Sequence, residues 1–193
     1  MTTPTVPTPD LPAGLSNVPR TIVMVGLMGA GKSAIGRRIA QRLGLPFVDA
    51  DAEIERAAGQ TIEEIFATHG EAYFRDGERR VIARLLGEPV HVLSTGGGAF
   101  MDPETRRLIA ERGISVWLRA ELEVLLRRTS RRSNRPLLKG RDPAEVLIKL
   151  MELRYPVYAQ ADIVIESTDG PPEATVQQAI DALARHLARE TAS

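Results

Sequence analysis

The sequence of 193 residues contains no cysteine, and this absence excludes several kinds of chemistry. Without thiols the chain has no disulfide, no thiol nucleophile and no cysteine-bound metal. A surplus of either charge is missing as well, because 25 basic residues balance 25 acidic ones. A balanced chain has no overall signature of binding to nucleic acid or to a membrane surface, and we expect neither kind of partner.

Long hydrophobic runs are also missing. No apolar run approaches the ~18 residues of a transmembrane helix, and the N-terminus lacks the basic and apolar regions of a secretory signal. We therefore expect a cytoplasmic protein. Residues 1–20 are rich in Thr and Pro without hydrophobic periodicity, which predicts a disordered extension. With 43% hydrophobic residues, the chain has enough for a core, and its length predicts a single domain over residues 21–193.

What the sequence does contain is a glycine-rich loop, GLMGAGKS, at Gly26–Ser33. It follows an apolar run, Ile22–Val25, and precedes a helix-period segment, Ala34–Leu43, which is the order of a phosphate-binding P-loop. In such a loop, backbone N–H groups surround phosphates, Lys32 reaches the β- and γ-phosphates, and the Ser33 hydroxyl ligates Mg²⁺. A chance glycine-rich turn does not account for this order. The expected ATP-binding residues of the loop are Gly29, Ala30, Gly31, Lys32, Ser33 and Ala34.

Two carboxylates, Asp49 and Asp51, follow the next predicted strand, Leu45–Val48. Ligands of open α/β sheets collect at the carboxyl ends of the strands. Alternate residues of an extended segment face the same side, so both carboxylates would point into one site. One would then serve Mg²⁺ and the other a substrate hydroxyl. An equally supported alternative is that one of them caps the helix predicted over Ala52–Ala57.

Arg75 and Glu78 are three positions apart, which lets them pair on one face of a helix. The pair is either a surface salt bridge or an arginine held in place to clamp an anionic substrate. Farther along, Gly96–Gly98 follow the apolar strand Val90–Leu93. Three glycines at this place either bring bare backbone against a neighbouring group or form a flexible turn.

A basic segment over residues 127–141 contains no acidic and no aromatic residue. Single-stranded nucleic-acid sites usually interleave aromatic and basic residues, so RNA binding is disfavoured. The alternatives are a solvated loop or, as we favour, a lid that brings arginines over a triphosphate. Its basic residues are Arg127, Arg128, Arg131, Arg132, Arg135, Lys139 and Arg141.

Short apolar strands alternate with amphipathic segments along the whole chain. One such segment, Ala144–Tyr155, carries Arg154 near its end, before Pro156. About five strands in this alternation predict a doubly wound parallel α/β sheet with the nucleotide at its carboxyl edge.

The ordered motifs together resemble the shikimate kinase family. They are GLMGAGKS at 26–33, DAD at 49–51, FRDGE at 74–78, GGG at 96–98, RPLL at 135–138 and RYPVY at 154–158. The resemblance covers roughly residues 21–168. It implies a P-loop NTPase fold of the nucleoside-monophosphate-kinase type, with a five-stranded parallel sheet in the order 2-3-1-4-5, flanking helices and a lid. It also implies ATP- and Mg²⁺-dependent phosphorylation of the shikimate 3-hydroxyl in aromatic amino-acid biosynthesis, by a protein that we expect to be a monomer.

The resemblance also implies a role for single residues. Shikimate would be bound by Asp51, Arg75, Gly97 and Arg154. Mg²⁺ would be served by Ser33 and Asp49, and Arg128 would pack near the adenine of ATP. Arg135 would be the lid arginine that reaches the phosphates, so that the catalytic set is Lys32, Asp51 and Arg135. The planar forks of two arginines suit the carboxylate of shikimate better than the point charge of lysine does.

Two other functions are compatible with parts of this pattern. Another small-metabolite kinase of the same fold, such as a gluconate kinase, would share the P-loop without needing two arginines for a carboxylate. A non-catalytic nucleotide-binding module would bind ATP and turn over no acceptor. The combination of Lys32, Asp51 and Arg135 argues against the second alternative.

Overall fold

A five-stranded sheet forms the centre of the protein. The computed structural model describes residues 11–192 except for 13, 132–137 and 139. All strand pairs in the sheet are parallel, in the order β2-β3-β1-β4-β5, so the expected fold class and strand order are confirmed. The strands are β1 (Thr21–Val25), β2 (Phe47–Asp49), β3 (Val92–Ser94), β4 (Gly113–Arg119) and β5 (Ile163–Glu166).

The central strand β1 is buried along its whole length, as expected for a parallel strand covered on both faces. Its register aligns the carboxyl ends of its neighbours. Met24 is the partner of Ser94, which is in turn the partner of Asp49 on the far side of β3. Polar side chains of two strands therefore reach the same edge of the sheet.

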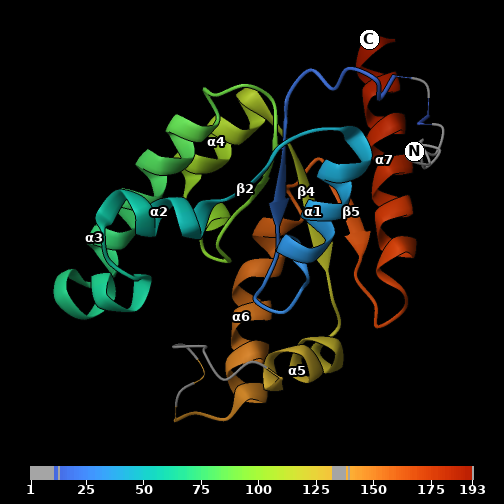
Figure 1. Cartoon of the computed structure of the whole chain (residues 1–193). Helices are drawn as coiled ribbons and strands as arrows, with labels where there is room; N and C mark the ends of the chain where they lie inside the picture. Colours follow the sequence, from blue (N-terminus) through green and yellow to red (C-terminus); the bar gives the residue numbers. More distant parts are fainter. Residues whose placement is uncertain (1–10, 13, 132–137, 139, 193) are drawn as a thin grey trace, which may run out of the picture.

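Helices lie on both sides of this sheet (Figure 1). In that view α1 and α7 lie to one side of β1, whereas α2, α3 and α4 lie to the other, and α5 and α6 lie below the carboxyl ends of the strands. The helices are α1 (Lys32–Leu43), α2 (Ala50–Ala58), α3 (Ile62–Leu85), α4 (Pro103–Arg112), α5 (Leu122–Ser130), α6 (Pro143–Tyr158) and α7 (Pro172–Thr191), with a short 3₁₀ helix, η1, at Ala99–Met101.

Close packing of α1 on the sheet depends on Gly36. A Cβ atom at this residue would lie 2.9 Å from Phe47 Cε2 and 3.2 Å from Met24 Cγ, so a larger residue would push the helix away. The apolar stripe of α1 includes Ile35 and Ile39, both buried as the periodicity predicts. This packing fixes the first turn of α1 above the carboxyl edge of β1.

Helices α2 and α3 have a small hydrophobic core of their own, made of Ile54, Ile65 and Phe74. Gly70 interrupts α3 with a φ of 81°, which divides it into a short and a long part. Phe66 is 36% exposed and packs its ring on Phe74 at the border of this small core.

The N-terminal segment differs from the expected disorder up to residue 20. Leu15 and Val18 are only 1% and 5% exposed and belong to the main hydrophobic core. Arg20 donates to the carboxylate of Glu190 on α7 at 2.5 Å. Two isolated apolar anchors produce no periodicity in the sequence, so the pattern of Thr and Pro concealed them. Residues 1–10 lie outside the described part.

Helix α6 continues beyond its expected end at Tyr155. It passes through Pro156 and ends at Tyr158, which is fully buried. A proline inside a helix removes one N–H donor, and burial of the Tyr158 side chain in the last turn offsets this loss. The continuation keeps Arg154 and Tyr158 four residues apart on the same face of one helix.

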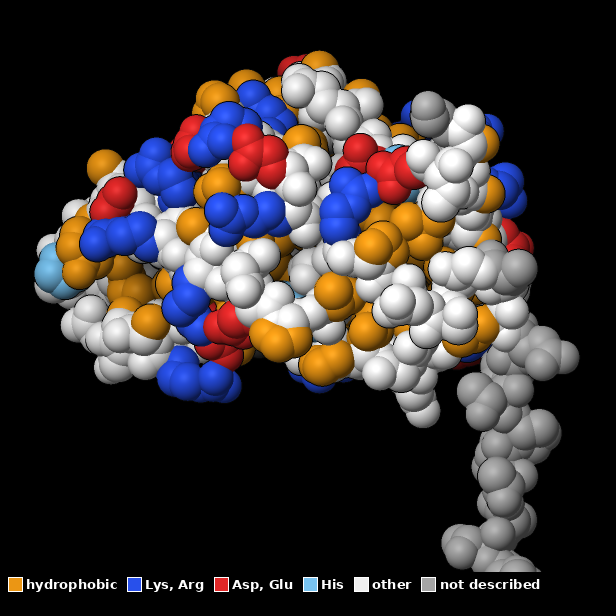
Figure 2. All heavy atoms as spheres, turned by 90° about the horizontal axis from the view of Figure 1, so that it is seen from above, with side chains coloured by type: hydrophobic (Ala, Val, Ile, Leu, Met, Phe, Trp, Pro, Cys, Tyr) orange, Lys and Arg blue, Asp and Glu red, His pale blue; other side chains and the backbone are white. Residues whose placement is uncertain are grey.

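On the face that carries the amino ends of the strands, basic and acidic side chains are interspersed (Figure 2). Exposed pairs such as Arg84 with Glu88, at 2.6 Å, occur on the protein surface and contribute little to its stability. Within the described residues, no helix has the length and apolar character needed to cross a membrane.

Candidate active site

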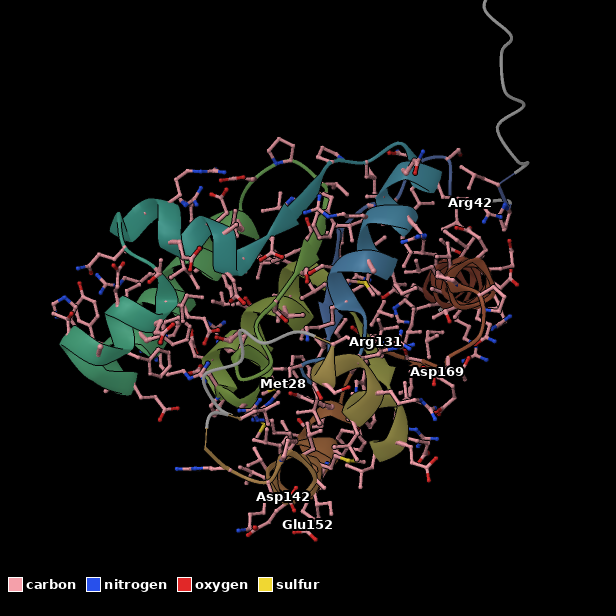
Figure 3. All side chains as sticks on the ribbon, turned by 60° about the horizontal axis from the view of Figure 1, so that its bottom comes forward. Met28, Arg42, Arg131, Asp142, Glu152 and Asp169 are labelled. Carbon is pink, nitrogen blue, oxygen red and sulfur yellow. The ribbon has the colours of Figure 1, made fainter. Side chains whose placement is uncertain are left out.

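A cleft of about 990 Å³ lies at the carboxyl edge of the sheet. One wall is formed by the P-loop and the start of α2, and a second by the loop after β3. The third wall comes from α5 and from the loop between β5 and α7. Met28 of the P-loop and Arg131 after α5, both labelled in Figure 3, line this cleft.

The P-loop has the strand–loop–helix context that its sequence predicts. Gly29 and Gly31 have φ angles of 82° and 96°, in the left-handed region that favours glycine. Gly31 is also the N-cap of α1 and provides no side chain to cap it. The first N–H groups of α1 therefore point toward the cleft as donors for an anion. The ammonium of Lys32 donates to the carbonyls of Gly26 and Leu27 at 2.8 and 2.9 Å.

The two oxygens of Asp49 have different partners. Oδ1 accepts from the backbone N–H groups of Asp51 and Ala52 at 3.0 and 3.3 Å, so Asp49 caps α2. Oδ2 accepts from the hydroxyl of Ser33 at 3.1 Å. The cap that the sequence offered as an alternative to a metal site is therefore present, but it uses only one of the two oxygens.

A small cluster of oxygen atoms surrounds the Ser33 hydroxyl. Asp49 Oδ2 lies on one side of it, and the buried Ser94 hydroxyl lies 3.3 Å away on the other. Oxygen ligands fit Mg²⁺, which is commonly held by one or two protein groups together with phosphates and water. Among the described residues, no group of three or more His, Cys, Asp or Glu is placed to hold a metal ion.

Asp51 lies in the first turn of α2 and not on an extended segment. The strand alternation expected to align the two carboxylates is therefore wrong, and the turn of the helix brings Asp51 to the cleft instead. Burial raises the pKa of the Asp51 carboxyl, and the neighbouring Asp49 raises it further, whereas Lys32 opposes both effects. The result is a carboxylate that is more basic than usual, next to the P-loop lysine.

Arg75 and Glu78 form the ion pair that their spacing predicts, with Nη1 donating to Oε2 at 2.6 Å. A surface salt bridge is excluded, because the Glu78 side chain is only 4% exposed. Burial raises the pKa of the Glu78 carboxyl, and the facing Arg75 lowers it. Since a buried carboxylate is costly without a partner, Glu78 holds the guanidinium of Arg75 in one place.

The three consecutive glycines leave room for side chains of the cleft. A Cβ atom on Gly96 would lie 3.0 Å from Asp51 Oδ1, and one on Gly97 would lie 3.0 Å from Arg154 Nη1. A Cβ atom on Gly98 would lie 2.5 Å from Arg75 Nη1, which is a collision. The glycines are thus explained by the close approach of Asp51, Arg75 and Arg154, and not by a flexible turn.

Arg128, the residue predicted to lie near adenine, joins three segments. Its Nη1 donates to the carbonyls of Gly29 and Ala30 at 3.2 and 3.1 Å, and to the Ser167 hydroxyl at 2.9 Å. Ser167, which sequence reasoning missed, in turn donates to the Ala30 carbonyl at 2.7 Å. Its only signal in the sequence is a position directly after β5. The predicted lid arginine, Arg135, lies outside the described residues, as do the other lid residues in 132–137 and residue 139.

A phosphate-binding loop faces, across one cleft, a glycine loop that Arg75 and Arg154 approach, next to a carboxylate of raised pKa. This combination on a parallel sheet with the P-loop after β1 is that of a P-loop kinase.

Comparisons with known proteins identify the family within this class. A family model described as shikimate kinase matches residues 28–184. Shikimate kinase of Paramagnetospirillum magneticum is 62% identical over 87% of this chain and 86% of its own length. That of Caulobacter vibrioides is 60% identical over 85% of this chain and 82% of its own. This chain belongs to the shikimate kinase family and is an ATP-dependent phosphotransferase.

Solved structures agree with this assignment. Shikimate kinase from Acinetobacter baumannii in complex with shikimate is 40% identical, covers 86% of this chain and 93% of its own, and superposes with a TM-score of 0.82. A gluconokinase from Sinorhizobium meliloti has a TM-score of 0.64 at 21% identity, which indicates a shared fold only. The gluconate kinase alternative is therefore not favoured.

Proposed function

We propose that this protein transfers the γ-phosphoryl group of ATP to the 3-hydroxyl of shikimate, giving shikimate 3-phosphate and ADP. The observation that carries this proposal is the convergence of Arg75 and Arg154 on the adjacent residues Gly98 and Gly97. Two guanidinium groups beside the glycine loop that borders the cleft suit an acceptor with a carboxylate. The family membership supports the same acceptor.

On the acceptor side, Arg75 and Arg154 bind the carboxylate of shikimate. Arg75 is oriented for this by the buried Glu78, so little conformational entropy is lost on binding. The backbone of Gly97 contacts the ring of the substrate. Because the nucleotide and acceptor sides of the cleft come from the same chain, the protein is able to act as a monomer.

Asp51 accepts a hydrogen bond from the shikimate 3-hydroxyl and aligns its oxygen for attack on the γ-phosphorus. Its raised pKa brings the carboxylate nearer to the basicity at which it takes the hydroxyl proton as the new P–O bond forms. The proton then resides on Asp51, and the electrons of the broken bond remain on the β-phosphate of ADP.

On the nucleotide side, the backbone of Gly29–Ala34 and the ammonium of Lys32 bind the phosphates. Lys32 leaves the carbonyls of Gly26 and Leu27 when its ammonium turns to the β- and γ-phosphates. Ser33 and Asp49 would hold Mg²⁺, which would neutralise charge on the phosphate oxygens. Arg128 borders the adenine, and Arg135, from the lid, adds positive charge over the transferred group. Catalysis then consists mostly of positioning and electrostatic stabilisation.

A coupled assay of ADP release tests this function. With ATP and Mg²⁺, we expect ADP release to depend on shikimate, with gluconate and a nucleoside monophosphate as comparison acceptors. Release with gluconate and not shikimate would overturn the role of Arg75 and Arg154 but leave the P-loop assignment intact. Binding of ATP without release for any acceptor would favour the non-catalytic alternative.

The pH dependence of kcat/KM for shikimate tests the basic character of Asp51. Because only the ionised carboxylate accepts the proton, we expect activity to increase as the pH rises through the pKa of Asp51. Burial places this pKa above its ordinary value of 3.8, so the acidic limb of the profile should lie at a higher pH than for an ordinary aspartate. Burial also raises the pKa of Glu78, so this carboxyl is the other candidate source of an acidic limb. If Asp51 is the source, the variant Glu78→Gln should retain the limb. Full activity down to pH values near 3.8 would contradict the role.

A further inference from the structure

Tyr158, the last residue of α6, is fully buried and donates its hydroxyl hydrogen bond to the carbonyl of Gly97. Its ring packs among aromatic neighbours, with centroid distances of 5.8 Å to Trp117 and 6.4 Å to Phe100. A phenylalanine would make the same ring contacts. The hydroxyl therefore has a purpose other than packing, and it donates to the loop that borders the acceptor side of the cleft.

Tyr158 is also joined to Arg154, one helical turn earlier on the same face of α6. The Arg154 guanidinium lies 3.0 Å from where a Cβ atom of Gly97 would be. Burial raises the pKa of the Tyr158 hydroxyl to about 12, with the nearby Arg154 opposing this effect. The hydroxyl therefore remains protonated and remains a donor throughout the physiological pH range.

We infer that Tyr158 is a positioning residue that sets acceptor affinity by fixing the Gly97 peptide against the Arg154 guanidinium. Three consecutive glycines have access to many backbone conformations, so this loop needs a fixed partner. The Tyr158 hydroxyl is that partner, and α6 supplies Arg154 from the same rigid face. This inference rests on the proposed function insofar as Gly97 and Arg154 contact the acceptor.

The variant Tyr158→Phe removes the hydroxyl and retains the ring. The half-buried Gly97 carbonyl then loses this donor, and acceptor binding has to order the loop. We expect the KM and the calorimetric Kd for shikimate to rise about tenfold, as loss of a single hydrogen bond to a buried group would produce. The KM for ATP should change by less than about twofold, because the P-loop lies on other elements.

The variant Tyr155→Phe is a matched control. Tyr155 lies on the same helix, packs edge-on to Trp117 at 5.0 Å, and donates its hydroxyl to the carbonyl of Ala120 at 2.5 Å. It loses the same chemical group and the same type of bond, but away from the acceptor loop. We expect its KM for shikimate to stay within about twofold of the parent protein, even where its melting temperature falls.

Amide hydrogen exchange tests whether Tyr158 orders the glycine loop, and it needs no acceptor. Exchange at residues 96–98 should be faster in Tyr158→Phe and unchanged in Tyr155→Phe. Unchanged exchange at these residues, or equal KM changes for shikimate in both variants, would overturn the inference. A parent protein inactive with shikimate would refute the proposed function instead, and the exchange result would still decide whether Tyr158 orders the loop.

Discussion

Replacing Asp51 with Asn is expected to lower kcat by about two to four orders of magnitude, the usual contribution of a general base. The amide keeps the size and the hydrogen-bonding ability of the side chain but takes no proton from the 3-hydroxyl. Binding of ATP should be nearly unaffected, because the phosphates contact the P-loop. Steady-state kinetics with shikimate varied at saturating ATP measures the change, and near-normal turnover would contradict the role of Asp51 as a base.

The same variant is expected to be more stable than the parent protein. A folded-state pKa raised by burial means that the folded chain binds more protons than the unfolded chain between the ordinary and the raised pKa. Stability therefore falls as the pH rises through this window, and at neutral pH the ionised carboxylate costs stability that the neutral amide does not. Urea unfolding at neutral pH measures the gain.

Asp76→Asn is the control for this stability prediction. Its side chain is 48% exposed and paired with Arg79 and Arg80 on the surface of α3, so neither kcat nor stability should change much. An Asp51→Asn protein that loses both activity and stability would indicate that Asp51 is a structural residue.

Replacing Arg75 with Lys is expected to raise the KM for shikimate about 10- to 100-fold, as loss of a charge-assisted hydrogen bond does. Lysine keeps the positive charge beside the buried Glu78 but loses the planar fork that binds a carboxylate through two bonds. The KM for ATP should remain near that of the parent protein. Calorimetric titration with shikimate separates the loss of affinity from any effect on turnover.

Arg79→Lys is a matched control on the same helix. Arg79 is 39% exposed and also pairs with carboxylates, at 3.1 Å to Asp76 and 3.5 Å to Asp102, but unlike Arg75 it is not the side chain against Gly98. Its replacement should leave the affinity for shikimate unchanged. Equal affinities in the parent, Arg75→Lys and Arg79→Lys proteins would refute the proposed clamp.

The parts of the site that local sequence patterns determine were predictable. The P-loop needs glycines, lysine and serine at fixed spacing, and Arg75 and Glu78 are paired by the geometry of a single helix. The strand order β2-β3-β1-β4-β5 was predictable only through resemblance to a known family. Strand alternation in the sequence does not say which strands are neighbours.

The remaining parts depend on contacts between distant segments, which leave no periodic signal. Leu15 and Val18 are buried although the segment around them has the composition of a flexible tail. Ser167 follows a short strand like any other serine, yet it bonds to the P-loop carbonyl of Ala30. The role of Tyr158 depends on a helix that continues through a proline, against the local preference.

The two oxygens of Asp49 have different tasks, because Oδ1 caps α2 and Oδ2 accepts from Ser33. No other residue type does both. Asparagine retains the cap of α2 but presents no charge beside Ser33, and serine caps the helix but does not reach as far. Glutamate keeps the charge, but its additional methylene displaces both oxygens. Each of these replacements loses at least one of the two tasks, so position 49 should tolerate substitution less well than the exposed carboxylates Asp76 of α3 and Glu104 of α4.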